Sequence, residues 1–242
     1  MSTAEQIIAH VQSSTGLCIS PAWLSSFISS SSAQRNIPAS TLTKTALFRV
    51  LASDFRESLS NNPTSLFPLD TSDPKIQERR LQGPIPVQVL DIEDIGTSLW
   101  SQVEAIERVE RGESIRGREI VRTVNVGEDA AEAAANNGSG TNPGASGSSG
   151  SGPHRLILQD AAGTRAVGVE MKRIDGVSLE KLAIGAKFLL RGATVARGII
   201  LLDPGCATLL GGKIELLDRP WKEGRKSRLL ERIASMQVED TQ

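Results

Sequence analysis

The chain is poor in aromatic, cysteine and histidine side chains, and these shortages exclude several classes of function. It has no tyrosine, and aromatic residues make up only 3% of its 242 positions. Cys18 and Cys206 lie far apart in the sequence and form no Cys-x-x-Cys pair, so we expect two reduced thiols in an intracellular protein. His10 and His154 are equally isolated, which leaves no zinc site or His-based triad to assemble. No metal or cofactor is expected.

Net charge and long apolar runs are also missing. The formal net charge is −1, so any contact with nucleic acid must come from a local patch. The longest apolar runs, such as residues 199–202, are far too short to span a bilayer. The first residues lack the basic and apolar regions of a secretory signal. With 39% hydrophobic residues, the composition predicts a soluble globular protein with its own core and no membrane partner.

Residues 1–63 are expected to form a bundle of three helices. The first has a short apolar face around Ile7 and Val11, and the second begins at Ser20-Pro21, an N-cap serine followed by proline at the first helical position. A third helix is expected from about Ser40 to the Asn-Asn-Pro sequence at 61–63. Its apolar stripe recurs every four residues, at Leu47, Leu51, Phe55 and Leu59. None of these helices could bury its face alone, so we expect them to pack together.

From Gly83 the hydrophobic period changes towards two, which is typical of strands. Residues 64–82, rich in proline and charge, are expected to connect the two parts. Strands are predicted at 85–92, 155–159, 164–171, 187–190, 193–195, 199–202, 208–210 and 214–217, with a helical turn at 178–182. This order predicts an oligonucleotide/oligosaccharide-binding (OB) barrel over residues 83–220 and an α+β fold overall. Residues 221–242 are expected to form one C-terminal helix and a tail, with a solvated basic start at Lys222, Arg225, Lys226 and Arg228.

A long insertion, residues 94–153, separates the first barrel strand from the others. Loops longer than about 15 residues in a compact domain are usually functional or disordered. The insertion begins with an apolar stripe at helical spacing, continues with a basic and apolar stretch, and ends in a Gly/Ser/Asn-rich tether at 127–153. We expect this arm to reach into a partner protein; the alternative is that its stripe docks on the barrel. The residues expected to contact the partner are Leu99, Trp100, Val103, Ile106, Arg116, Arg118, Ile120 and Val121.

Several segments together resemble the RecQ-mediated genome instability (Rmi) protein family in their order, their spacing and the insertion after the first strand. They are Leu81-Gln-Gly-Pro84, Val87-Gln-Val-Leu-Asp-Ile92, Gly168-Val-Glu-Met171, Gly185-Ala-Lys-Phe-Leu-Leu-Arg-Gly192, Gly198-Ile-Ile-Leu-Leu-Asp-Pro204 and Leu210-Gly-Gly-Lys-Ile-Glu-Leu-Leu217. The resemblance covers residues 83–217 well and the N-terminal helices in outline. The chain is similar to the short fungal form, so functions of a second OB domain found in longer relatives are not carried over.

The resemblance implies a helical bundle followed by an OB barrel, in a nuclear subunit that binds topoisomerase III and works with a RecQ-family helicase. It also implies that the insertion reaches into the topoisomerase gate and promotes decatenation and double Holliday junction dissolution. On the barrel, Lys187 follows the Gly185 turn, and we expect it to be an exposed contact with the topoisomerase; the alternative is a solvated lysine with no such contact.

Independent binding of single-stranded DNA is the alternative function, because many OB barrels bind it. Such sites combine a basic groove with aromatic platforms, each stack worth about 1–3 kcal/mol. Phe188 is the only aromatic residue between Arg155 and Leu217, so we expect no more than weak, salt-sensitive DNA contact, by Arg173, Arg191 and Arg197. Catalysis is not expected, since residues 205–213 lack the spacing of a phosphate loop and no other catalytic set is present.

Overall fold

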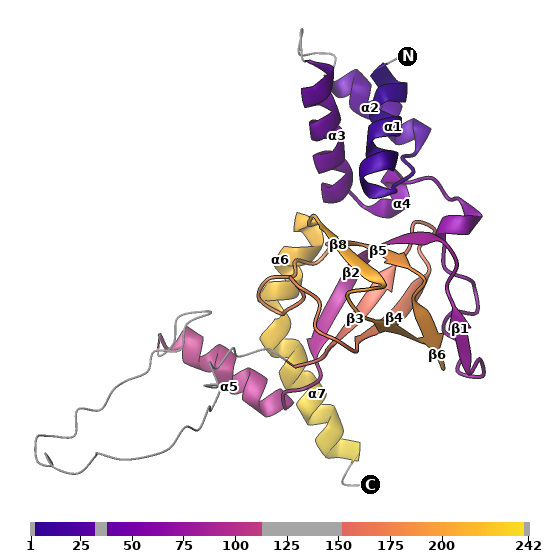
Figure 1. Ribbon diagram of the computed structural model, residues 1–242. Coiled ribbons are helices and arrows are strands. Elements are labelled where there is room, and N and C mark those ends of the chain that lie inside the picture. Colours follow the sequence, from indigo (N-terminus) through magenta and orange to yellow (C-terminus); the bar gives the residue numbers. More distant parts are fainter. Residues whose placement is uncertain (1–2, 32–37, 113–151, 240–242) are drawn as a thin grey trace, which may run out of the picture.

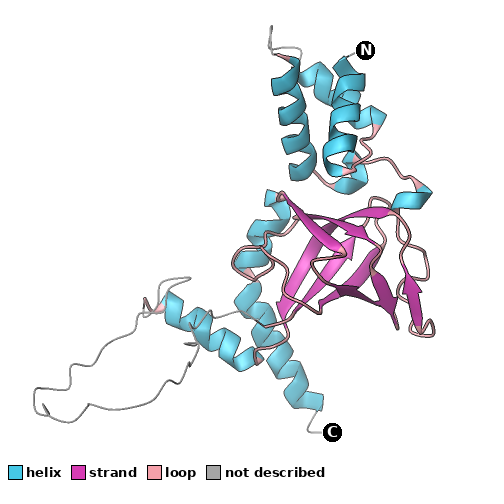
Figure 2. Ribbon diagram, viewed as in Figure 1, coloured by secondary structure: helices cyan, strands magenta, loops and turns pink. Residues whose placement is uncertain are grey.

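The computed structural model describes residues 3–31, 38–112 and 152–239. In Figure 1 a bundle of helices stands at the N-terminal end, a rolled sheet lies beneath it, and three further helices lie along one side of the sheet. Figure 2 shows how the strands and helices separate into these parts. The three side helices are α5 (Leu99–Glu110), α6 (Glu215–Glu223) and α7 (Arg225–Glu239).

The predicted helical bundle is confirmed. It consists of α1 (Thr3–Thr15), α2 (Pro21–Ser31) and α3 (Ala39–Ala52), with the short α4 (Phe55–Ser58) beneath them. Helix α2 begins at Pro21 as expected, and the Leu24 amide donates to the Ser20 carbonyl over 3.0 Å. The bundle has an apolar core, and its fully buried members include Ile7, Val11, Leu17, Ala46, Val50 and Phe55.

The prediction of one helix from Ser40 to residue 60 is wrong, because α3 ends at Ala52 and a separate helix follows. The Asp54 carboxylate accepts the Arg56 amide over 2.9 Å and so caps a new helix, α4, that starts at Phe55. The break also changes which side chains point into the bundle core. Val50 and Phe55 are fully buried, whereas Leu47 and Leu51, expected to lead the stripe, are only half buried.

The sheet has eight strands in the order β1-β6-β7-β4-β3-β2-β5-β8. Its organising strand is β2 (Pro84–Asp94), which pairs through its first half with β5 (Lys187–Arg191) and through its second half with β3 (His154–Gln159). A register shift between Val89 and Asp91 bends β2 between these partners, as β-bulges do in small barrels. The rolled sheet encloses a core of aliphatic side chains around Phe188, and the predicted OB barrel is confirmed.

The remaining strands are β4 (Arg165–Glu170), β6 (Thr194–Ala196), β7 (Ile199–Leu202) and β8 (Ala207–Gly211). They agree with the predicted positions to within one or two residues. The predicted helical turn at 178–182 is a single turn, closed by a hydrogen bond of 2.9 Å from the Leu182 amide to the Ser178 carbonyl. The expected connector holds a 3-10 turn, η1 (Pro63–Ser65), and the strand β1 (Glu78–Arg80), which pairs with β6. It therefore forms one edge of the sheet.

The expected strand at 214–217 is wrong, because Ile214 precedes helix α6. Its amide donates to the Ile184 carbonyl over 3.0 Å, and its side chain lies against Gly185, where a Cβ would be only 2.5 Å from Ile214 Cγ1. Buried Asp218 then accepts the Ile184 amide over 2.9 Å and fixes α6 on the barrel. The single predicted C-terminal helix is in fact two, α6 and α7, separated at Gly224.

Candidate partner-binding surfaces

The root of the insertion is a fully capped turn between β2 and α5. The Asp94 carboxylate accepts the amides of Gly96 and Thr97 over 2.8 and 3.1 Å and the Thr97 hydroxyl over 2.8 Å. Ser98 then caps α5 by accepting the Ser101 amide over 3.1 Å. Because these bonds satisfy donors of the turn and one of the free amides at the helix start, they fix locally the direction in which the chain leaves the barrel.

Helix α5 divides the residues expected to face a partner into two groups. Val103 is 4% exposed and Ile106 half buried, because α5 packs on the protein's own α7. The expectation that the whole stripe faces a partner is therefore wrong for Val103. The alternative was that the stripe docks on the barrel; Val103 is buried within the protein, but the element that α5 packs against most is α7. Leu99 is half buried, whereas Trp100 is 60% exposed. Of the α5 residues, Trp100 offers the largest apolar surface to another molecule.

The other predicted partner residues of the insertion lie outside the described residues. These are Arg116, Arg118, Ile120 and Val121, and the tether at 127–153 lies outside them up to residue 151. Their expected roles stay predictions.

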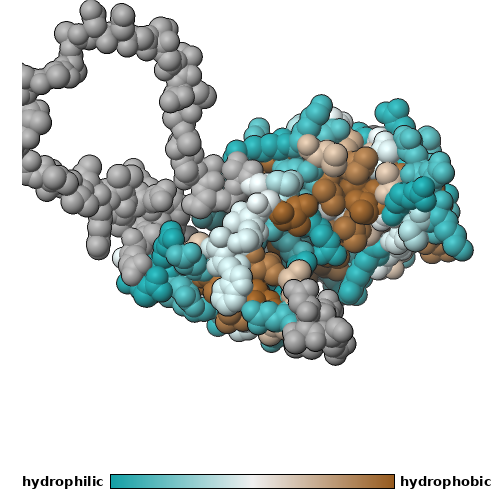
Figure 3. All heavy atoms as spheres, turned by 90° about the horizontal axis from the view of Figure 1, so that it is seen from below, coloured by the Kyte–Doolittle hydropathy of each residue, from teal (hydrophilic) through white to brown (hydrophobic). Residues whose placement is uncertain are grey.

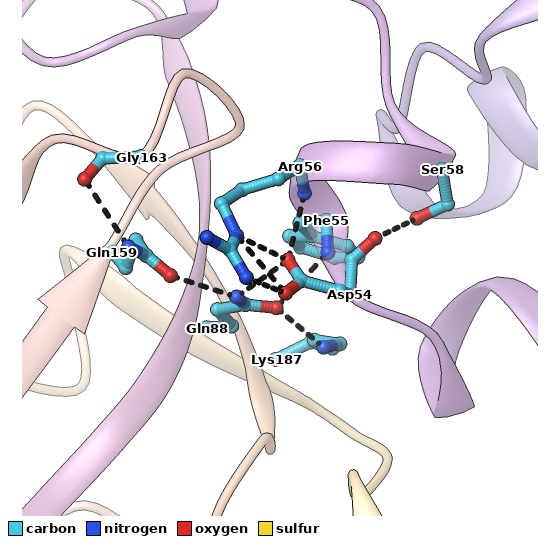
Figure 4. A network of polar contacts seen from close by, with 8 residues as sticks. All are labelled: Asp54, Phe55, Arg56, Ser58, Gln88, Gln159, Gly163 and Lys187. Atoms are coloured by element: carbon cyan, nitrogen blue, oxygen red, sulfur yellow. Dashed lines mark hydrogen bonds and ion pairs between the residues drawn. The ribbon is translucent and has the colours of Figure 1, made fainter.

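Lys187 is not an exposed contact, and that expectation is wrong. Its side chain is fully buried, its ammonium lies 4.5 Å from the centre of the Phe55 ring, and it donates to the Gln88 amide oxygen over 2.9 Å (Figure 4). Burial lowers the pKa of the Lys187 ammonium to about 7, since desolvation penalises the charged form more than nearby Asp54 favours it. In this conformation a partner cannot reach the ammonium.

Gln88 is the centre of the polar network that Figure 4 shows, because β2 places it opposite both Gln159 and Lys187. Its oxygen also accepts the Phe55 amide over 3.0 Å, and its nitrogen donates to Asp54 over 2.9 Å and to Gln159 over 3.0 Å. Burial acts to raise the pKa of Asp54, but the hydrogen bonds from Arg56 and Gln88 outweigh it and lower that pKa. One barrel residue thus holds the first turn of α4, and the network joins the bundle to the barrel.

The three arginines expected to touch DNA lie apart. Arg191 ends β5 beside Gly16 of the bundle, and Arg173 lines a cavity at the insertion root. Arg197 has a φ of +51° and forms, with Gly198, the two-residue turn between β6 and β7, where its guanidinium donates to the Pro74 carbonyl over 3.4 Å. They do not line one groove. Phe188 is buried, and among the described residues the large exposed aromatic side chains are Trp100 and Phe48 of α3, so the described barrel surface lacks a stacking platform.

Sequence reasoning missed a buried pair at the insertion root. His154 begins β3, and its Nδ1 lies 2.6 Å from a carboxylate oxygen of Glu170, whose other oxygen accepts the Ile174 amide over 2.7 Å. The two residues border a cavity of about 300 Å³. Only the strand pairing of β3 with β4 brings them together, so no sequence spacing could have revealed them. The described residues contain no group of three side chains that could hold a metal ion.

The face with the insertion root carries exposed apolar side chains. Figure 3 views the molecule from below, where α5 and α7 lie, and shows apolar side chains gathered over the barrel and between the helices. Exposed members near the root and on the helices are Ile95, Trp100, Val109, Met171, Leu230 and Met236. Surfaces of this kind are typical of protein contact sites. None of the described helices has the length and apolar character needed to cross a membrane.

Comparison with known proteins matches both parts of the fold. Residues 67–225 match the family model described as RMI1, N-terminal OB-fold domain, and residues 12–58 match the RMI1 N-terminal helical domain. RecQ-mediated genome instability protein 1 of Schizosaccharomyces pombe is 28% identical over 210 residues, which cover 85% of this chain and 86% of that protein. The matched ranges include the bundle, the barrel and the root of the insertion.

Proposed function

The chain belongs to the RMI1 family, and we propose that it is a non-catalytic subunit of a RecQ helicase–topoisomerase III complex. A function in genome stability linked to RecQ follows from the family. We propose in addition that the protein binds topoisomerase III and acts on its gate through the insertion between β2 and β3. This work is done on chromosomal DNA, so the proposal includes a nuclear location.

The observation that carries the proposal is the arrangement at the insertion root. Strand β2 ends there and β3 begins there, with Asp94 paired opposite His154, and the chain leaves β2 through a capped turn and a helix. Trp100 stands exposed on that helix beside other apolar surface. Large aromatic side chains are common anchors in protein interfaces. A rigid base with an exposed anchor suits an arm that acts on another protein.

The mechanism is a shift between two states of the partner. A subunit that binds the open gate of the topoisomerase better than the closed gate lengthens the open state, and only its difference in affinity for the two states counts. A longer open state favours passage of a second duplex, and hence decatenation and double Holliday junction dissolution. The protein needs no catalytic group of its own for this.

Single-strand binding by the free protein is the second candidate function. Against it, the described barrel surface lacks a stacking platform, and its three candidate arginines point to different parts of the molecule. The two functions are separated by mixing the protein with topoisomerase III and, separately, with a fluorescent single strand at near-physiological salt. We expect a stable protein complex and weak, salt-sensitive DNA binding. Tight DNA binding with no protein complex would reverse the assignment.

Two deletions test the role of the insertion. Because Asp94 and His154 are paired, residues 95–153 can be replaced by an Asn-Gly turn, which closes the β2–β3 hairpin. A matched second variant keeps residues 95–112 and replaces 113–151 by a Gly/Ser linker of about ten residues, long enough to return along α5. We expect both variants to bind topoisomerase III and both to lose most of the stimulation of decatenation. Full stimulation by either variant would remove the assigned role of the segment it lacks.

A further inference from the structure

The C-terminal helix α7 crosses the insertion helix α5 at the side of the barrel (Figure 1). It is the element against which α5 packs most extensively, and each helix buries an apolar residue, Val103 on α5 and Ile233 on α7. From the sequence, α7 is expected only to be a C-terminal helix with a solvated basic start.

Polar contacts between α5 and α7 continue into the turn at the insertion root. Gln102 is buried, and its nitrogen donates to the carbonyls of Asp94 and Thr97 over 3.0 and 2.9 Å. Its oxygen accepts a hydrogen bond from the Arg225 guanidinium over 3.3 Å. The first residue of α7 is therefore connected, through one amide side chain, to the last carbonyl of β2.

Ion pairs hold the same two helices farther along α5. The Lys226 ammonium lies 2.6 Å from a carboxylate oxygen of Glu110 and 3.3 Å from one of Glu107, which are nearly one helical turn apart. Farther along α7, Arg232 lies 2.9 Å from a carboxylate oxygen of Glu93 on β2. The contacts at Gln102 and at Glu110 hold α5 at two points along its length. They therefore fix the angle of the helix as well as its position.

We propose that α7 positions the insertion helix α5, and that Lys226 is the positioning residue that fixes the angle of this helix. The Asp94 turn determines where the chain leaves β2, but a turn alone does not hold the far end of a helix of 12 residues. Lys226 supplies that second point of attachment. The consequence for decatenation rests on the proposed function, whereas the effect on α5 does not.

The test is charge reversal at Lys226 with a charge-swapped rescue. Lys226→Glu places a third carboxylate beside Glu107 and Glu110. The backbone amides of residues 103–110 in α5 should then exchange hydrogen about fivefold faster, because the ion pairs are replaced by repulsion. The midpoint of urea denaturation should not change, since the altered pairs are partly exposed. The triple variant K226E/E107K/E110K restores opposite charges, and Lys226→Arg conserves them; both should exchange at nearly the original rate. Lys181→Glu, an exposed barrel lysine, is the control for net charge.

The second readout uses topoisomerase III and catenated DNA circles. We expect Lys226→Glu to bind the topoisomerase as tightly as the unaltered protein but to stimulate decatenation about threefold less, with recovery in the triple variant. Unchanged exchange in Lys226→Glu would overturn the assignment of Lys226. Faster exchange with unchanged decatenation would overturn the positioning role. If the unaltered protein fails to bind or stimulate the topoisomerase, the proposed function fails, and the exchange result still decides whether α7 holds α5.

Discussion

Lys187 buries an ammonium group between the barrel and the Phe55 ring, and this makes the stability of the fold depend on pH in a specific way. In the folded chain desolvation lowers its pKa to about 7, and in the unfolded chain the pKa returns to its ordinary value of 10.5. Between these two pH values the unfolded state binds more protons than the folded state. The free energy of unfolding therefore rises with pH through this window, and the cost of burying the charge disappears above it.

The size of the effect follows from the shift. The change from 10.5 to about 7 corresponds to about 5 kcal/mol, at about 1.4 kcal/mol for each pH unit. We expect the free energy of unfolding of the unaltered protein to rise by about 2 to 3 kcal/mol between pH 7.5 and 9.5, relative to Lys187→Met. Methionine is unbranched like lysine, is one atom shorter and carries no charge, and the Gln88 oxygen keeps its bond from the Phe55 amide.

The assay is urea denaturation of the unaltered protein and of the variant at pH 7.5, 8.5 and 9.5. Lys181→Met removes an exposed lysine from the same barrel, and its stability should follow that of the unaltered protein across this range. If the stabilities of the unaltered protein and Lys187→Met instead change in parallel, Lys187 does not titrate near neutral pH. The burial of its charged group would then be refuted.

Three further substitutions test other parts of the structure. Gln88→Met leaves the Phe55 amide and the Lys187 ammonium without their shared acceptor, so urea denaturation should show a loss of about 3 kcal/mol. Gly212→Val should cost about 2 kcal/mol or more by the same assay, because Gly212 has a φ of +87° and a Cβ there would lie 2.3 Å from the Leu51 carbonyl oxygen. Trp100→Ala should leave the denaturation midpoint unchanged and weaken the topoisomerase complex about tenfold or more, measured by calorimetry; equal affinity would exclude Trp100 as an anchor.

The bundle and the barrel could be predicted because apolar periodicity reports local structure directly. Strands at 187–190 and 199–202 appear within a residue of their predicted positions, since glycines or turns bound them on both sides. Ile214 to Leu217 has the same apolar character, but Asp218 and the tight approach of Ile214 to Gly185 make it the start of a helix. Those contacts join residues about thirty positions apart, and no local pattern contains them.

In the candidate site, too, local structure could be predicted from the sequence and long-range contacts could not. The helical spacing of Leu99, Val103 and Ile106 predicted α5 correctly, but not which face α7 covers, since that depends on a helix far along the chain. The position of Lys187 after the Gly185 turn predicted an exposed side chain, and that prediction is wrong. Its partners, Gln88 and Phe55, come from β2 and α4, and only the folded chain brings them to it.

The two junctions of this fold are held by different forces, and they should respond differently to salt. Gln88 and Lys187 join the bundle to the barrel in a buried network, where added ions screen little. Lys226 holds α5 through pairs with Glu107 and Glu110 that are partly exposed, and such pairs weaken as ionic strength rises. Salt should therefore speed hydrogen exchange in α5 before it affects α4. A charged partner surface can therefore adjust the position of α5, which carries Trp100, more readily than the position of the bundle, which stays fixed on the barrel.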